Sequence, residues 1–550
     1  MTDTLSHTDM LSDNAALAAD ALVADDPMAD YLPEAMRPWH SDAARMSFAA
    51  AVEARDRDRT VLDIPIVIDG VRRSGSGTLD SIDPGDTARV IARAENATAA
   101  HADEAIASAL RAHNEWSRTP AAERGAVLRR AAQWMRERRD ELAALQVFEA
   151  GKPWAEGDAD LCEAIDFLEY YARQAVVLER GGEVQSPPGE ANSMSYRPRG
   201  VTVVIAPWNF PLAIPTGMVA GAIAAGNATI LKPAEQTPAV AYGLLQAFEA
   251  AGLPKGVLNF LPGPGEVVGA RLVEHPDVAT IVFTGSRAVG FGIMETAAKV
   301  VEGQRTIKRV ICELGGKNPL LIASDADLDE VVPAAAKSAF GFAGQKCSAT
   351  SRLLVVDELH DQLVARLVEH SRELLVGHPR DGEVDLGPVI DAEAHARLMA
   401  SSMPDAGTVV HRGAAPEGGF FVPPTIVTGL PDDHPYVRDE HFGPLLAVVK
   451  RPTLDGLIEV ANSTPYALTA GVFTRSARDI QHVTSQLRAG NIYVNRGTTG
   501  AIVGRQPFGG FGHSGVGSKA GGPDYLKNFT DPVVVTENTV RAGFTPDLLS

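Results

Sequence analysis

The fold of this chain is constrained most strongly by short apolar runs that alternate with longer helical segments. The runs VTVVIAPWNF, ATILKPAE, GVLNFLPG and VATIVFTG begin at residues 201, 228, 256 and 278. They are rich in β-branched residues, are bounded by Gly or Pro, and are separated by helical segments such as residues 238–250. This alternation is typical of a parallel sheet covered by helices, so we expect an α/β fold.

A second series of the same kind follows Glu313, with the runs PLLIAS, SRLLVVDEL, PLLAVVKR and LTAGVFT. Before both series, the run IPIVIDGVR predicts a strand, a turn and another strand, and helical periodicity follows over residues 103–116 and 123–148. The sequence therefore predicts two open parallel-sheet α/β domains that meet near Glu313. Catalytic sites commonly form at such junctions.

Composition limits the classes of function. The 550 residues suffice for two or three domains. With 70 acidic and 50 basic side chains the net charge is −20, which disfavours a nucleic-acid or anionic-membrane partner, because both need a basic face. Three cysteines are too few for a disulfide framework or a zinc site, so we expect no metal and a reducing compartment. The chain lacks a signal-peptide pattern and an apolar run of roughly 20 residues, which favours the cytoplasm.

The first 36 residues differ from the rest, with eight acidic and no basic side chains among many alanines and serines. This composition predicts a mobile or loosely docked extension. An amphipathic cap over a neighbouring subunit is the alternative. The globular pattern begins at about residue 61.

Cys347 is the strongest candidate for a reactive side chain. It lies in GQKCSATSR, between small and polar residues, downstream of the segment ELGGK that begins with Glu313. A thiol in this setting suggests a nucleophile served by a carboxylate base from elsewhere in the fold. The alternative is a buried structural thiol, which is what most free cysteines are. We expect Cys312 to be a buried strand residue and Cys162 a helix residue, neither with a function.

Asn209 is a candidate ligand for an oxyanion. In PWNFP it is held between two prolines directly after an apolar run, so that its side-chain N–H points in a fixed direction. A developing oxyanion requires such a donor. An ordinary turn asparagine is the alternative.

Two turns suit a nucleotide. FTGSRAVG, residues 283–290, is a glycine-rich turn from a strand into a helix, where backbone amides can approach a phosphate; plain turn geometry is the alternative. In KPAEQTP, Lys232 and Glu235 follow a strand at the edge where open α/β sheets bind ligands. A carboxylate there accepts ribose hydroxyls and repels a 2′-phosphate, which favours NAD over NADP. The alternative is a solvated helix start.

The motifs PWNFP, KPAEQTP, FTGS, ELGGKNP, GQKC and EHFGP, in this order, resemble the aldehyde dehydrogenase superfamily across roughly residues 61–540. The resemblance implies a Rossmann-type NAD-binding domain (residues 61–182 and 200–312) and a catalytic domain (313–528). It also implies a small β-flap for oligomerisation (183–199 and 529–541), and it leaves residues 1–60 as an extension.

The resemblance assigns a role to each motif. Cys347 attacks the aldehyde, Asn209 and the Cys347 backbone N–H hold the oxyanion, and Glu313 activates the water that hydrolyses the thioester. The implied cofactor contacts are Lys232 and Glu235 for the adenosine ribose, Gly285 and Ser286 for the pyrophosphate, and Glu440 and Phe442 for the nicotinamide and its ribose.

The stretch Asn495–Leu526 resembles the 1-pyrroline-5-carboxylate dehydrogenases, which oxidise L-glutamate γ-semialdehyde to L-glutamate in proline catabolism. Backbone N–H groups of its TTGAIVG segment can cradle a carboxylate; a flexible crossover is the alternative. The implied substrate contacts are Ser348, Gly500 and Ala501 for the carboxylate, Phe210 and Phe508 for the aliphatic stem, and Glu163 for the ammonium. Asp166 is an alternative to Glu163 as the ammonium partner, and packing in the core is an alternative role for Phe508.

Other activities remain open at this point. A different carboxylated semialdehyde, such as succinate semialdehyde, would fit the same amides, and a scaffold that kept the fold without catalysis is the alternative of another class. By resemblance we expect a homodimer or a higher homo-oligomer. The N-terminal extension is too short for a proline dehydrogenase barrel of about 250 residues, so we expect a separate proline dehydrogenase upstream.

Overall fold

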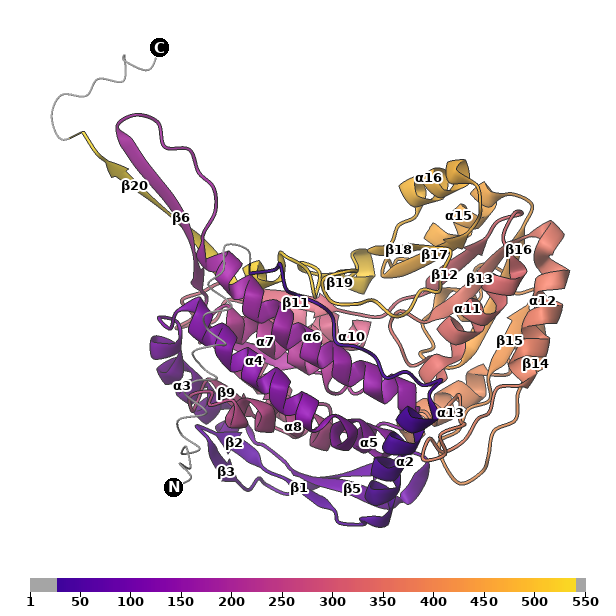
Figure 1. The fold of residues 1–550 in the computed structure, drawn as a ribbon, viewed down its shortest axis with the longest axis horizontal. Coiled ribbons are helices and arrows are strands. Elements are labelled where there is room, and N and C mark those ends of the chain that lie inside the picture. Colours follow the sequence, from indigo (N-terminus) through magenta and orange to yellow (C-terminus); the bar gives the residue numbers. More distant parts are fainter. Residues whose placement is uncertain (1–26, 541–550) are drawn as a thin grey trace, which may run out of the picture.

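The structure is a computed structural model that describes residues 27–540. It has two α/β bodies side by side and a two-stranded ribbon that projects from the first body (Figure 1). The prediction of two open α/β units is confirmed, but the sheets are mixed: their centres are parallel and their edges carry antiparallel strands.

The first body contains an eight-stranded sheet and a smaller three-stranded sheet. The eight strands in spatial order are β19 (Gly515–Val516), β11 (Arg309–Glu313), β10 (Val278–Thr284), β7 (Val201–Ile205), β8 (Ala228–Lys232), β9 (Leu258–Phe260), β2 (Ile66–Ile68) and β3 (Val71–Arg73). The smaller sheet has the order β1 (Leu62–Ile64), β5 (Asp86–Glu95), β4 (Thr78–Asp83).

Helices cover both faces of the larger sheet, because successive side chains of a strand point to opposite faces. Val204 and Leu231 face the layer of α4, α6, α7 and α8, whereas Val203 and Ile230 face α3, α9 and α10. The helices are α3 (Ala99–Trp116), α4 (Ala121–Glu137), α5 (Arg139–Glu149), α6 (Trp154–Glu179), α7 (Ala213–Ala224), α8 (Pro238–Ala250), α9 (Ala270–Glu274) and α10 (Arg287–Ala297).

The second body is built on a seven-stranded sheet, parallel except for β14 at one edge. Its strands in spatial order are β14 (Thr408–Arg412), β15 (Thr425–Thr428), β16 (Leu445–Arg451), β13 (Thr350–Val356), β12 (Asn318–Ile322), β17 (Thr469–Phe473) and β18 (Asn491–Val494). Its helices are α11 (Leu328–Phe340), α12 (Asp357–Arg372), α13 (Ala392–Ser401), α14 (Pro435–Arg438), α15 (Leu454–Asn462) and α16 (Ala477–Gln486).

The ribbon pairs β6 (Glu190–Pro198) with β20 (Thr530–Asn538) in antiparallel register and extends away from both sheets (Figure 1). The short strand β19 comes from the C-terminal part of the chain, yet it pairs with β11 in the first body. The chain therefore returns to the first body after completing the second.

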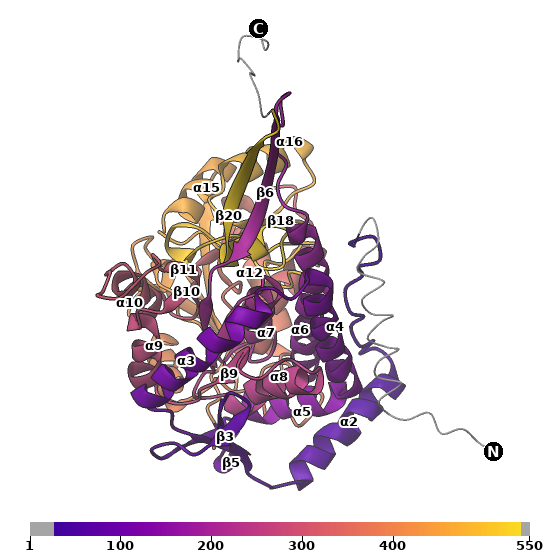
Figure 2. The same cartoon turned by 90° about the vertical axis from the view of Figure 1, so that its left-hand side faces the viewer.

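Two expectations from the sequence need correction. The helix expected over residues 123–148 is two helices, because Arg138 leaves the helical conformation (φ −116°, ψ 23°) and α5 turns toward α2 (Asp42–Arg57) and α8. The expected mobile or loosely docked arm lies largely outside the described residues. The described residues of this arm, however, belong to a segment, residues 28–39, that runs along α4 and α6 (Figure 2). We call this segment the strap.

No helix in residues 27–540 combines the length and the apolarity needed to cross a bilayer.

Candidate active site

A cavity of about 440 Å³ lies between the two bodies. Both bodies supply its walls. It brings together the three candidate catalytic residues and four of the six candidate cofactor residues: Asn209, Gly285, Ser286, Glu313, Cys347, Glu440 and Phe442.

The chain reaches Cys347 through an irregular turn that follows α11. Phe342 (φ 54°), Ala343 (φ 52°) and Gly344 (φ 68°) are three consecutive residues in the left-handed region, which costs a non-glycine residue about 1 kcal/mol or more. The next residue, Gln345, is fully buried and its side chain accepts a hydrogen bond from the Ile390 N–H at 2.9 Å. The turn is thus held in a strained shape that sets the position of Cys347 in the cavity wall.

The resting thiol of Cys347 is protonated. Burial raises its pKa, and the carboxyl groups of Glu313, Glu440 and Glu163 raise it further, while the Ser348 backbone N–H opposes them. Since the thiolate is the nucleophilic form of cysteine, the reaction must remove this proton when the substrate is in place.

Asn209 extends from the end of β7 and contacts the other body. Its Nδ2 donates to the Gln345 carbonyl at 3.0 Å, which places a side-chain amide two residues from Cys347. Asn209 is almost fully buried. Its second N–H has no acceptor among the described residues and can serve an oxyanion formed on the substrate.

Lys152 fixes the turn that carries Asn209. Its Nζ donates to the Asn209 carbonyl at 3.0 Å and lies 4.0 Å from the centroid of the Phe210 ring. It also pairs with Asp160 at 3.8 Å, and both side chains are fully buried. The Asp160 carboxylate accepts the N–H groups of Leu212 (3.3 Å) and Ala213 (3.1 Å) just beyond the turn.

Glu313 ends β11 and faces the last part of the chain. Burial raises the pKa of its carboxyl group to about 8, and Lys519 opposes this shift. Its Oε2 is buried with no hydrogen-bond partner among the described residues. A carboxyl group in this state is neutral over part of the physiological range and acts as a base once it ionises.

Lys232 and Glu235 form a pair at the end of β8. Lys232 Nζ lies 2.6 Å from Glu235 Oε1, and the same oxygen accepts the Gly265 N–H at 2.8 Å. This fixes a carboxylate at the edge of the sheet. At the end of β10, which is separated from β8 by β7, Ser286 caps α10, so this helix N-terminus opens onto the cavity beside Gly285, an arrangement suited to phosphate groups.

The opposite wall of the cavity carries Glu440 and Phe442. Glu440 accepts the Gly316 N–H at 2.8 Å, and burial raises its pKa to about 7. A side chain at Gly315 would begin 1.8 Å from Glu440 Oε2, so any residue other than glycine would displace this carboxyl group. Phe442 has a left-handed backbone (φ 55°), and its ring packs edge-on against Trp208 with centroids 5.6 Å apart.

The candidate carboxylate contacts are linked to Cys347 through the adjacent Ser348. The backbone carbonyl of Ser348 accepts a hydrogen bond from Thr498 Oγ1 at 2.7 Å, which connects the nucleophile to residues 499–504, the anchor loop. The N–H groups of Gly500 and Ala501 have no acceptor among the described residues. Two adjacent amides are therefore available to a carboxylate.

The structure separates the two acidic residues proposed on α6. The Glu163 carboxyl raises the pKa of Cys347, and its own pKa rises to about 8 through burial and the nearby Asp160. Asp166 instead accepts the Glu34 N–H of the strap at 2.6 Å. Of these two α6 residues, Glu163 is thus the one whose carboxyl group acts on the nucleophile.

The two aromatic candidates are placed differently. Phe210 contacts Lys152, and Phe508 exchanges two backbone hydrogen bonds of 2.8 Å with Ala520. Like Ser348, Gly500, Ala501 and Glu163, they are absent from the residues that line the described 440 Å³ cavity. None of the six substrate candidates therefore lines the cavity that holds the catalytic candidates and four of the cofactor candidates.

A profile described as "Aldehyde dehydrogenase family" matches residues 71–535. The chain belongs to the aldehyde dehydrogenase family. It is 44% identical over 499 residues to a protein of Geobacillus thermodenitrificans named 1-pyrroline-5-carboxylate dehydrogenase, with 90% of this chain and 97% of that protein covered. To 1-pyrroline-5-carboxylate dehydrogenase 2 of Bacillus subtilis it is 46% identical over 467 residues, covering 84% and 91%.

Solved structures support the same family assignment. A 1-pyrroline-5-carboxylate dehydrogenase from Thermus with bound NAD matches with a TM-score of 0.90 at 40% identity, covering 92% of this chain and 99% of that one. Proline utilization A from Bdellovibrio bacteriovorus matches with a TM-score of 0.92 at 44% identity, covering 95% of this chain but only 55% of that one. The resemblance to aldehyde dehydrogenases is thereby confirmed.

Some residues of this aldehyde dehydrogenase site were not found from the sequence. Lys152 lies in EAGKPW, where the pattern shows only the end of a helix, and nothing local shows that a lysine there is fully buried. Thr498 was read only as part of a glycine-rich loop. Arg397 and Trp208 line the cavity, but no motif marked the arginine.

Proposed function

We propose that this aldehyde dehydrogenase oxidises L-glutamate γ-semialdehyde, the open-chain form of 1-pyrroline-5-carboxylate, to L-glutamate with reduction of NAD. The relatives named 1-pyrroline-5-carboxylate dehydrogenase support it over almost their full lengths. The observation that carries it is the Thr498–Ser348 hydrogen bond, because it joins a loop with two available amides to the nucleophile. An aldehyde that also carries a carboxylate fits this arrangement.

The first chemical step falls to Cys347 and Asn209. The Cys347 sulfur releases its proton to water and forms a bond to the aldehyde carbon as the carbonyl π bond breaks, giving the anion of a thiohemiacetal. The carbonyl oxygen gains negative charge and is stabilised by the Asn209 side chain and the Cys347 backbone N–H. Lys152 and the Gln345 carbonyl both form hydrogen bonds with Asn209 and hold it in place.

The cavity residues suit NAD. The Ser286 helix terminus, the Glu235 carboxylate and the Glu440 wall offer partners for phosphate, adenosine ribose and nicotinamide ribose, respectively. When bound, NAD supplies the acceptor for the hydride that leaves the thiohemiacetal carbon. The carbon is thereby oxidised to a thioester with Cys347, and Glu313 then takes a proton from water, whose oxygen attacks the thioester and releases the acid and the thiol.

The remaining candidate residues each bind a different part of the substrate. Gly500, Ala501 and Ser348 hold the α-carboxylate, Glu163 pairs with the ammonium, and Phe210 and Phe508 enclose the aliphatic stem. The choice of Glu163 over Asp166 is supported by the engagement of Asp166 with the strap.

The substrate is tested by comparing kcat/KM for glutamate semialdehyde and succinate semialdehyde, followed as NADH formation. We expect a clear preference for the first, because only it presents an ammonium to Glu163. A preference for succinate semialdehyde would overturn the choice of substrate. No turnover of either would favour the scaffold alternative.

Coenzyme choice is expected to depend on Glu235. Glu235→Ser removes the carboxylate that repels a 2′-phosphate and leaves Lys232 free to pair with it, so the NADP-to-NAD ratio of kcat/KM should rise about tenfold or more. Glu274, an exposed acidic residue that ends α9, offers a control as Glu274→Ser. An unchanged NADP-to-NAD ratio of kcat/KM in the Glu235 variant would show that Glu235 does not contact the adenosine ribose.

We also propose that two copies pair through the ribbon. Apart from one bridge between Met194 of β6 and Gly182, its strands pair only with each other among the described residues, and Val534 and Val535 of β20 are 59% and 52% exposed. Unpaired strand edges and apolar side chains favour association. A cytoplasmic location and a separate proline dehydrogenase that supplies the substrate complete the proposal.

A further inference from the structure

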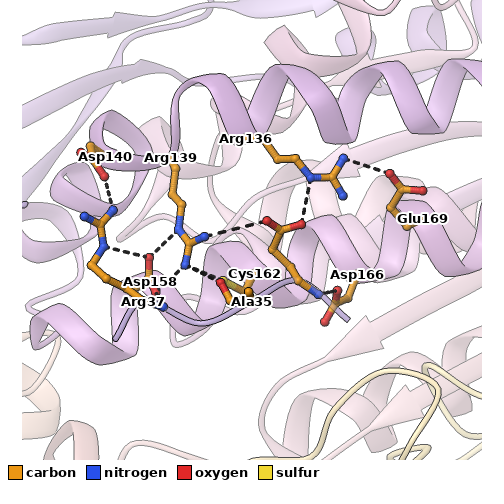
Figure 3. A network of polar contacts seen from close by, with 10 residues as sticks. Ala35, Arg37, Arg136, Arg139, Asp140, Asp158, Cys162, Asp166 and Glu169 are labelled. Atoms are coloured by element: carbon orange, nitrogen blue, oxygen red, sulfur yellow. Dashed lines mark hydrogen bonds and ion pairs between the residues drawn. The ribbon is translucent and has the colours of Figure 1, made fainter. Parts of the chain in front are cut away.

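The strap is fastened at its centre by Glu34. The Glu34 carboxylate lies 2.8 Å from Arg136 Nε of α4, and its backbone N–H donates to Asp166 Oδ1 of α6 at 2.6 Å (Figure 3). Side chain and main chain of one residue thus bind two different helices.

A second attachment follows at Arg37. Its backbone N–H donates to Asp158 Oδ2 at 3.0 Å. The Asp158 side chain is fully buried and is paired with Arg139 Nε at 2.7 Å (Figure 3). Removing one partner of such a buried pair leaves an uncompensated charge and is strongly destabilising. The strap therefore has a fixed position on α4, α5 and α6.

The N-terminal end of the strap reaches the anchor loop. Tyr31 Oη donates to the Val503 carbonyl at 3.2 Å. Its ring packs edge-on against Tyr170 of α6 with centroids 5.2 Å apart. Burial raises the Tyr31 pKa, so the hydroxyl keeps the proton that it donates.

Gly504 fits directly against this pair of tyrosines. A side chain there would begin 2.9 Å from Tyr31 Cε1 and 3.2 Å from Tyr170 Cε2, and the residue has φ +75°. The close approach of the loop to Tyr31 thus requires glycine, for space and for backbone conformation.

Other contacts hold the anchor loop at its ends. At the start, Arg496 Nη2 donates to the carbonyls of Thr499 and Gly500 at 3.0 Å. At the end, the Gly504 N–H donates to Gly521 at 2.9 Å. Between these points, the anchor loop accepts the hydrogen bond from Tyr31 at Val503. Among the contacts that the described N-terminal part of the chain makes with this loop, it is the nearest to the free Gly500 and Ala501 amides.

We propose that the strap positions the anchor loop for carboxylate binding, with Tyr31 as the positioning residue. This inference rests on the proposed function, because it takes the Gly500 and Ala501 amides as the carboxylate site. Tyr31 touches neither the nucleophile nor the cofactor cavity. Its effect is therefore confined to aldehydes that carry a carboxylate.

The test compares Tyr31→Ala and Tyr31→Phe in the full-length protein. KM and kcat are measured for glutamate semialdehyde, for hexanal, which has no carboxylate, and for NAD. Tyr31→Ala should raise KM for glutamate semialdehyde about tenfold, as expected for a displaced binding group. Tyr31→Phe, which loses one hydrogen bond, should raise it about fivefold. The KM values for hexanal and NAD, and kcat, should stay within about twofold of the parent values. A neutral surface substitution produces a scatter of about this size.

The strap supplies its own control. Leu32, next to Tyr31, is 81% exposed, so Leu32→Ala should leave all constants unchanged. The proposal is overturned if KM for glutamate semialdehyde is unchanged in both Tyr31 variants. It is equally overturned if the hexanal KM rises in parallel, since that would indicate general loosening of the site. If Tyr31→Ala fails to fold, the Phe variant decides alone.

Failure of the proposed substrate can be told from failure of this inference. If the parent prefers succinate semialdehyde, the substrate assignment fails, but the Tyr31 variants must still raise KM for that carboxylated aldehyde. If they leave it unchanged, the strap has no role in carboxylate binding.

Discussion

Cys347→Ala is expected to abolish aldehyde oxidation, lowering kcat by at least about 10⁴-fold, because no other group can form the covalent adduct. Binding of NAD should remain close to that of the parent, since the adenosine and phosphate contacts proposed here lie on β8 and α10. NADH formation and fluorescence titration with NAD measure the two effects separately.

Cys162→Ala is a suitable control for that experiment. Cys162 is a buried residue of α6 beneath the strap and has no place in the cavity wall among the described residues. Its removal should leave turnover near the parent value. Retained turnover in Cys347→Ala would remove Cys347 as the nucleophile.

Glu313→Gln is expected to stop the reaction after its first half. Oxidation to the thioester needs no water, so a burst of about one NADH per active site should precede a steady rate lowered by about 10²–10⁴-fold. The thioester on Cys347 should accumulate and be detectable by mass spectrometry of the intact protein. A full steady rate would exclude Glu313 as the base.

The pH dependence provides a second readout of Glu313. The pKa is raised to about 8 and the base works as the carboxylate, so thioester hydrolysis in the parent should speed up as pH rises through about 8 and then level off. Glu313→Gln should lose this rise, while Glu313→Asp should retain part of it. A parent profile that is flat between pH 6 and 9 would contradict the assignment.

The strands and the catalytic motifs were readable from the sequence because their determinants are local. The β-branched runs at β7 and β8 show strands directly, and Asn209 follows β7 while Glu313 ends β11. Parallel strands bring these two positions to one edge of the first sheet. Cys347 instead follows α11 and precedes β13, and it reaches the same cavity from the second body.

The strap was missed because its stabilisation is not local. Its acidic residues look like a solvated arm, and the arginines that bind Glu34 lie on α4 and α5, about a hundred positions away. The helix break at Arg138 was missed for a related reason: no Gly or Pro marks it, and it is set by the packing of α5 against α2.

The protonated state of Cys347 has a consequence for the durability of the enzyme. Peroxides and electrophiles attack thiolates far faster than thiols. Since desolvation and acidic neighbours raise the pKa of Cys347, we expect its thiol to react slowly with oxidants between turnovers. The raised pKa of Cys347 thus has two effects: it delays formation of the thiolate until the substrate is bound, and it slows oxidation of the sulfur in the resting enzyme.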